Sequence, residues 1–146
     1  MKKILFYALI AFSNFSYGCE VDLVKSQEIL NWLIKAKEAE VLRPIKSVKL
    51  PTIKWYSKLS VKEKSFCKEC LSFPEKAQMN MFIKETNEIW LIDDAREDQL
   101  VHELRHTLQF AEDPDVEGTE DWLEDDAVYW QNMYVEKFGR VKLCDN

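Results

Sequence analysis

The chain contains few of the residues that interrupt regular secondary structure. Its 146 residues include only three glycines and four prolines, and hydrophobic residues make up 47% of it. So little glycine and proline, with so much apolar content, excludes disordered, repetitive and fibrous designs. The length fits one folded domain and leaves little room for a second.

Positive charge is also scarce. The sequence has 20 basic and 26 acidic residues, which gives a formal net charge of −6. Its lysines are spread through the middle of the chain rather than clustered, as is typical of a solvated surface. Because nucleic-acid binding needs clustered lysine and arginine, we expect no nucleic-acid partner.

No hydrophobic run is long enough to cross a membrane. The apolar stretch Ile4–Phe12 has nine residues, whereas a transmembrane helix needs roughly 20. Lys2 and Lys3 precede this stretch, and small residues come shortly before position 19. The pattern predicts a signal peptide over residues 1–18, followed by a single mature domain over residues 19–146. We therefore expect export to the periplasm or out of the cell, with no transmembrane span.

Cysteines are few, and their positions suit disulfides. In an exported protein Cys19, Cys67, Cys70 and Cys144 can pair,. The short spacing of Cys67 and Cys70 predicts a local bridge, which leaves Cys19 and Cys144 to join the two ends of the mature chain. A lipid anchor on Cys19 is the alternative. We do not favour it, because the preceding residues lack the leucine that bacterial lipoproteins usually place three positions before the cysteine.

Hydrophobic periodicity and turn residues predict an α+β fold. The expected elements are a helix over Glu20–Val41, an extended segment over Ile45–Tyr56, strands Gln78–Ile83 and Glu88–Ile92, and helices from about Ala95 to Glu112 and from Thr119 to about Phe138. Asp93 or Asp94 is expected to cap the first of the last two helices, Thr119 to cap the second, and Gly139 to end it.

The only two histidines of the sequence lie four residues apart in the stretch Val101–Leu108. On a helix this spacing puts His102 and His106 one turn apart on the same face, where both imidazoles can bind one tetrahedral Zn²⁺. Glu103 follows ~100° round the helix. It would lie beside the metal, where it can take a proton from water. The pattern predicts a zinc site with Glu103 as the general base; the alternative is a pair of histidines with purely structural roles.

A third ligand is required, because catalytic zinc usually keeps three protein ligands. No histidine is left, so we expect a carboxylate from the last helix. If the last two helices are antiparallel about Asp115, His106 and Glu124 are level, and Glu124 also begins a mostly apolar stripe where an unpaired carboxylate is costly. Glu120, one turn earlier, is the alternative ligand. A capping box with Asp121 is the alternative role of Glu124.

Two runs carry a resemblance to known proteins: His102-Glu103-x-x-His106-x-x-Gln109 and Glu124-x-x-Ala127-x-x-x-Gln131. They resemble the gluzincin branch of zinc metallopeptidases and are similar to a group of small bacterial zincin-like proteins. The resemblance covers about residues 78–135. It implies a minimal zincin-like fold, in which a small, mostly antiparallel sheet lies over the active-site helix and an antiparallel glutamate-bearing helix follows.

The resemblance also implies an activity. The chain would be an exported, Zn²⁺-dependent metallopeptidase that acts on a peptide or protein substrate, with Glu103 as the general base and the peptide added to a sheet edge. Tyr129, Tyr134 and Arg105 are candidates for the donor that stabilises the oxyanion. Many larger gluzincins have an aspartate that orients a histidine where this chain has Val128. Two alternatives stay open: a zincin-like binding protein with a structural zinc site, and a metal-free interaction protein braced by disulfides.

Overall fold

The structure is a computed structural model that describes residues 19–66, 80–116 and 121–144. The predicted signal peptide, the Cys67–Cys70 pair and the residues Thr119 and Glu120 lie outside the described residues. In chain order the elements are α1 (Leu23–Val41), β1 (Thr52–Trp55), the 3₁₀ helix η1 (Tyr56–Lys58), α2 (Val61–Phe66), β2 (Met81–Ile83), β3 (Glu88–Leu91), α4 (Glu97–Glu112) and α5 (Asp121–Phe138). The predicted α+β class is confirmed.

The N-terminal helix α1 begins where a side chain accepts a hydrogen bond from a backbone N–H of its first turn. The Asp22 carboxylate accepts a hydrogen bond from the Lys25 backbone N–H at 3.0 Å, as expected of an N-cap aspartate. The helix therefore starts three residues after the predicted Glu20 and ends at the predicted Val41. It buries Ile29, Leu30 and Leu33, which share one face, in the main core.

The small sheet has the strand order β1–β3–β2 and is mixed. Strands β2 and β3 are antiparallel and form the predicted hairpin, in which Asn87 of the turn has a left-handed backbone (φ 52°). Strand β1 is parallel to β3. The expectation of a mostly antiparallel sheet thus holds for the hairpin alone. The connection between β1 and β3 is long enough for the crossover that a parallel pair needs.

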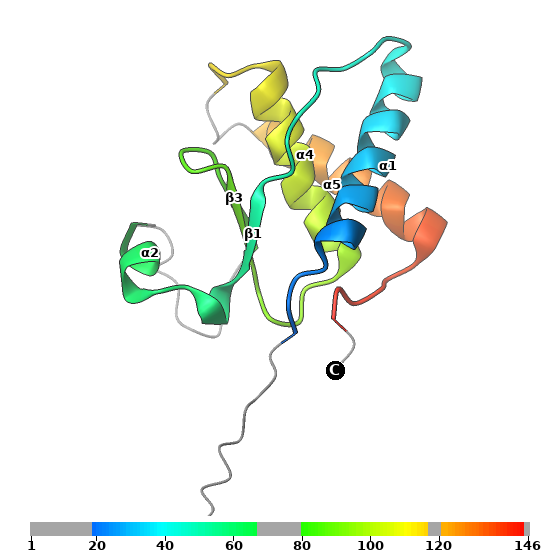
Figure 1. Cartoon of the computed structure of the whole chain (residues 1–146). Coiled ribbons are helices and arrows are strands. Elements are labelled where there is room, and N and C mark those ends of the chain that lie inside the picture. The colour runs from blue at the N-terminus through cyan, green and yellow to red at the C-terminus, as the bar shows by residue number, and fades with distance from the viewer. Residues whose placement is uncertain (1–18, 67–79, 117–120, 145–146) are drawn as a thin grey trace, which may run out of the picture.

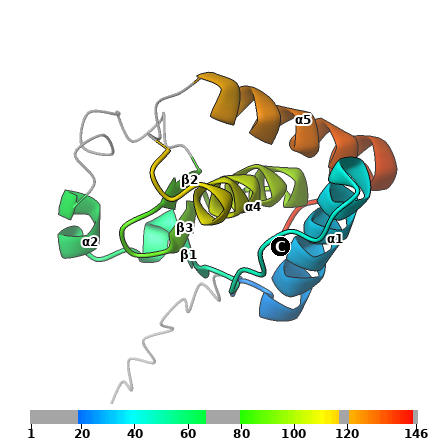
Figure 2. The same ribbon diagram turned by 90° about the horizontal axis from the view of Figure 1, so that it is seen from above.

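Helix α4 is the centre of the molecule. Figures 1 and 2 show it between the sheet on one side and helices α1 and α5 on the other. Its apolar residues Leu100, Val101, Leu104 and Leu108 are buried in the core shared by these elements. Because neighbours surround it, α4 has no broad solvent-facing side, and the polar residues of its middle turns lie against other elements of the protein.

The start of α4 is set by the C-terminal segment. The Leu143 backbone N–H donates to the Ala95 carbonyl at 3.1 Å, and the Glu97 N–H donates to the Val141 carbonyl at 2.9 Å. The helix begins at Glu97, two residues later than predicted, and neither of the two aspartates expected to cap it does so. The helix is capped instead by Gln99, whose side chain accepts from the Arg96 backbone N–H at 2.9 Å, together with these contacts to the C-terminal segment.

Helix α5 runs opposite to α4 along its side (Figure 2). As predicted it ends at Phe138, where Gly139 has the left-handed conformation (φ 80°) that favours glycine,. Residues that meet across the two helices are nearly equidistant from Asp115. His106 lies nine positions before it and meets Glu124, nine positions after it. This pair and the opposite directions of the two helices in Figure 2 confirm the predicted antiparallel arrangement.

The first and last described parts of the chain lie together. Cys19 and Cys144 are joined by a disulfide with a Cα–Cα distance of 6.1 Å across a sequence separation of 125. This is the pairing that the cysteine spacing predicts for these two residues. None of the helices in the part of the chain that the structure describes has the length and apolar character needed to cross a membrane.

Replacing Cys144 by serine is expected to lower the free energy of unfolding by about 2–4 kcal/mol, because the bridge restricts a long loop of the unfolded chain. Urea unfolding without reductant measures the loss. Cys67→Ser is the matched control, since a bridge across the short 67–70 loop restricts the unfolded chain much less. Recovery of Cys144 as a free thiol, in peptide maps of unreduced protein from an oxidising compartment, would contradict the pairing.

Candidate metal centre

The two histidines lie in the middle of α4, on the edge that faces α5. His102 and His106 are one turn apart, and the centres of their rings are 4.9 Å apart. Their Nε2 atoms point to the same place and are separated by 3.2 Å. His106 is nearly buried, with 11% of its side chain exposed, and His102 is more accessible at 17%. The site is thus closed at His106 and more open at His102.

Helix α5 brings Glu124 to the same point. One carboxylate oxygen, Oε2, lies 3.2 Å from His102 Nε2, and the other, Oε1, lies 3.2 Å from His106 Nε2. The Glu124 side chain is 59% exposed, so the cluster meets solvent on its α5 side. The structure brings the three predicted ligands together, and its geometry turns the Glu124 carboxylate toward the histidines rather than toward Asp121.

The spacing of these atoms allows the three side chains to share a metal ion. Ligands held at about 2.0–2.1 Å by a tetrahedral zinc ion lie roughly 3.3–3.4 Å from one another. The Nε2 atoms of His102 and His106 are 3.2 Å apart, and each lies 3.2 Å from a different oxygen of the Glu124 carboxylate. The same three residues form a group of potential metal ligands whose ligand atoms all lie within 4.8 Å of one another.

Electrostatics keeps the His106 ring ready to bind a cation. Burial lowers its pKa below the usual 6.5, although the hydrogen bond with Gln109 and the charge of Glu124 oppose this shift. A lowered pKa means that the ring is neutral near neutral pH. A neutral imidazole has one nitrogen with a free lone pair, which is the form that binds metals.

Glu103, the predicted general base, is buried between α4 and β2. Its pKa is raised to about 8, mainly by burial and also by the negative charge of Glu124, while a hydrogen bond with the Phe82 backbone opposes the shift. A carboxyl group in this setting releases its proton more readily when positive charge is close, because an opposite charge favours the ionised form. Glu103 therefore lies where a cation held by the cluster would control its protonation.

A series of hydrogen bonds holds the Nδ1 side of the His106 ring. The His106 Nδ1 atom lies 2.8 Å from Gln109 Oε1, and the Gln109 amide nitrogen donates to Asp126 at 2.9 Å. Asp126 in turn forms an ion pair with Arg105 at 2.5 Å. The motif has Gln109 three residues after His106, but its hydrogen bond to the His106 ring was not predicted.

The three candidate oxyanion donors are not gathered at the cluster. Arg105 is buried and engaged with Asp126. The Tyr134 hydroxyl is buried and donates to Glu97 at 2.5 Å. Tyr129 lies on the exposed side of α5, where its ring packs against the edge of Trp130. The structure thus gives Arg105 and Tyr134 structural partners and leaves Tyr129 at the surface.

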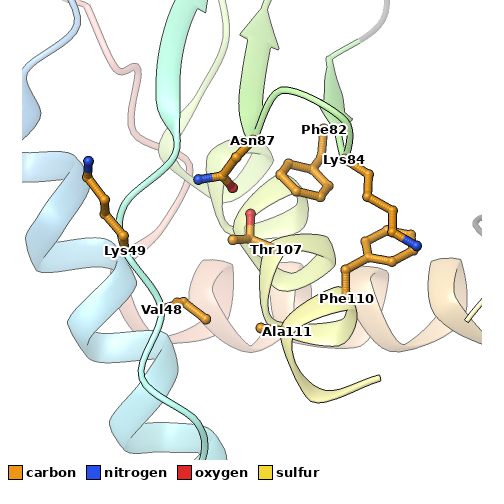
Figure 3. Close-up of a pocket in the computed structure, with 8 residues that line it drawn as sticks. All are labelled: Val48, Lys49, Phe82, Lys84, Asn87, Thr107, Phe110 and Ala111. Atoms are coloured by element: carbon orange, nitrogen blue, oxygen red, sulfur yellow. The ribbon is translucent and has the colours of Figure 1, made fainter. Parts of the chain in front are cut away.

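A separate hollow of about 270 Å³ lies on another side of α4. Figure 3 shows Phe82, Thr107 and Phe110 around it, with Lys49, Lys84 and Asn87 also lining it. The rings of Phe82 and Phe110 are stacked with centres 5.9 Å apart. Neither the histidines nor Glu124 line this hollow, so it is distinct from the cluster.

Comparison with protein-family models, with curated protein sequences and with solved structures finds no match to this chain. The function must therefore be argued from the geometry of the cluster and from the sequence motif.

Proposed function

We propose that the chain is an exported zinc-dependent metallopeptidase of the gluzincin kind, with His102, His106 and Glu124 as its metal ligands. The observation that carries the proposal is the convergence of these three side chains: the two Nε2 atoms are 3.2 Å apart, and each lies 3.2 Å from one oxygen of Glu124. The buried carboxyl group of Glu103, which follows His102 on α4 and feels the charge of Glu124, would supply the acid–base group that hydrolysis needs,.

The donor set fits zinc. Two imidazole nitrogens and one carboxylate oxygen are ligands that zinc accepts, and catalytic zinc sites typically have three protein ligands and one open position. Without a cation, each oxygen of the Glu124 carboxylate could accept a hydrogen bond from one histidine nitrogen,. A bound divalent cation would instead take a lone pair from each of the three side chains.

A zinc ion held there supplies a Lewis acid, which polarises a substrate carbonyl and makes water more acidic. Glu103 takes the proton from the attacking water and later delivers it to the leaving amine. A cation bound at the cluster would favour the ionised form of this buried carboxyl group, which is the form that takes a proton from water.

An extended substrate peptide could add as a further strand at the β2 edge of the sheet. Strand β2 has β3 on one side and is the outer strand of the described sheet on the other. Its residue Phe82 contacts Glu103 through the backbone. A peptide added in extended form along β2 would pass close to the cluster, and backbone hydrogen bonds would hold it with little dependence on its side chains.

Export fits the covalent structure. Disulfides persist in the periplasm and outside the cell rather than in the cytosol, and Cys19 is paired with Cys144. A sulfur atom in this bridge is not free to carry a lipid. The pairing therefore argues against a lipid anchor on Cys19.

A second candidate function is a zincin-like binding protein with a structural zinc site. Two observations favour it. Arg105 and Tyr134, which could stabilise an oxyanion, are bound to carboxylates elsewhere, and Nδ1 of His102 has no hydrogen-bond partner among the described residues. The two functions differ in whether the protein hydrolyses peptides, with Glu103 as the general base, or only binds a partner.

Replacing Glu124 by alanine is expected to weaken zinc binding by more than the roughly 10–100-fold loss that follows removal of a group supporting a ligand, because it removes a ligand itself. Competition with a chromophoric chelator measures the affinity. Asp125→Ala is the matched control: it removes an exposed neighbouring carboxylate and should leave the affinity unchanged. Glu120→Ala should also leave it nearly intact. A loss of zinc in Glu120→Ala but not in Glu124→Ala would move the third ligand by one helical turn.

A further inference from the structure

The side chain of Gln109 is held at both ends. It is 2% exposed and lies on α4, one turn after His106. Its amide nitrogen donates to the Leu123 carbonyl and to Asp126 Oδ2, both at 2.9 Å. Its amide oxygen lies 2.8 Å from His106 Nδ1. Every polar atom of this amide is thus engaged.

The partners on α5 determine which way the amide faces. A backbone carbonyl and an ionised carboxylate can both accept hydrogen bonds, and neither can donate one. The nitrogen end of Gln109 must therefore face Leu123 and Asp126. Its oxygen end is left for His106, and no exchange of the two amide atoms would satisfy the same neighbours.

Asp126 is itself fixed. Its Oδ2 atom accepts from Arg105 Nε at 2.5 Å as well as from Gln109. Arg105 is buried, and it makes a second, longer ion pair with Glu112 at 3.6 Å. A charged pair that is largely out of water is costly to separate, so the acceptor that orients Gln109 does not turn away.

The consequence reaches the ring of His106. An amide oxygen only accepts, so His106 Nδ1 must carry the proton. In a neutral imidazole the other nitrogen, Nε2, then has the free lone pair. Nε2 is the atom that lies 3.2 Å from both His102 Nε2 and Glu124.

We propose that Gln109 is a positioning residue that holds His106 in the tautomer whose Nε2 lone pair faces the cluster, with Asp126 and Arg105 fixing the orientation of the amide. This inference rests on the proposed zinc site and adds the part that prepares one ligand. The usual supporting group of a metal-bound histidine is a carboxylate, a backbone carbonyl or water. Here a glutamine connects the half-buried carboxylate of Asp126 to the ring.

The test uses Gln109→Met in the full mature chain. Methionine keeps the length of the side chain and removes both hydrogen-bonding ends. Gln131→Met is the matched control, because the Gln131 amide donates to the buried Asp98 carboxylate at 2.8 Å and touches neither histidine. Two quantities are measured: ¹⁵N chemical shifts of the His106 ring in metal-free protein, and zinc affinity by chelator competition.

In metal-free wild type and in Gln131→Met, the His106 proton is expected on Nδ1. In Gln109→Met that preference should disappear, and zinc affinity should fall by about 10–100-fold, as is typical when the group behind a ligand is removed.

A wild-type His106 that carries its proton on Nε2 would overturn the inference, and this measurement needs no variant. Equal losses of zinc affinity in Gln109→Met and Gln131→Met would also overturn it. A wild type that binds no zinc would instead remove the proposed function. The ring ¹⁵N shifts of the metal-free protein would still decide whether Gln109 sets the position of the proton.

Discussion

Replacing either His102 or His106 by alanine is expected to abolish zinc binding. Each substitution removes one of two imidazoles whose Nε2 atoms are 3.2 Å apart. The sequence has no third histidine that could take its place. Water and two remaining ligands hold zinc poorly, because the affinity of such sites depends on the number of protein ligands and their arrangement.

The measurement is the zinc content of each variant after dialysis against a weak chelator. Val101→Ala is the matched control: it shortens a buried side chain next to His102 on the same helix and removes no ligand. Circular dichroism should show the helices of all three variants. Zinc contents equal to that of the wild type in both histidine variants would exclude these residues as ligands.

Replacing Glu103 by glutamine is expected to leave zinc bound and to lower the rate of peptide hydrolysis by about 10²-fold or more. Glutamine has nearly the same shape but can neither take nor return a proton. The variant should fold, because a neutral amide at this buried position avoids the penalty of burying a charge, which is the main cause of the raised Glu103 pKa,.

Cleavage of a mixed peptide library, followed by mass spectrometry, measures the activity without prior choice of a substrate. Glu112→Gln, an equivalent change at the exposed end of the same helix, is the control and should keep the wild-type rate. Equal cleavage by Glu103→Gln and wild type would rule out Glu103 as the general base. Zinc-bound wild type that cleaves nothing would favour the binding function.

The main helices and the central pair of histidines could be predicted because their signals are local. A four-residue spacing puts His102 and His106 on one face of any helix. The position of Glu124 opposite His106 could be predicted from the length of the loop between two adjacent antiparallel helices. The structure has this arrangement. The hairpin of β2 and β3 was likewise encoded in a short stretch with its own turn.

The features that could not be predicted depend on residues far apart in the sequence. Strand β1 pairs in parallel with β3 across a long connection, and no local pattern distinguishes a parallel from an antiparallel partner. The start of α4 is fixed by hydrogen bonds to Val141 and Leu143 at the other end of the chain. Local capping residues gave the wrong boundary for this reason.

The same limit applies around the cluster. Tyr134 was a reasonable oxyanion donor by residue type, but its hydroxyl is bound to Glu97, 37 positions away. The resemblance places a residue that orients a histidine at position 128, where this chain has an exposed valine. The structure provides such a residue on α4 itself, in Gln109. That role depends on Asp126 and Leu123, which only the packing of the two helices brings into reach.

The zinc content of the wild-type mature chain tests the account most directly. Purified from a bacterial periplasm without added metal and measured by elemental mass spectrometry, the protein should contain close to one zinc ion per chain, as a single three-ligand site requires. A chain that contains no zinc, and that takes up none when zinc is offered in excess and then dialysed, would contradict the assignment of His102, His106 and Glu124 as a metal site.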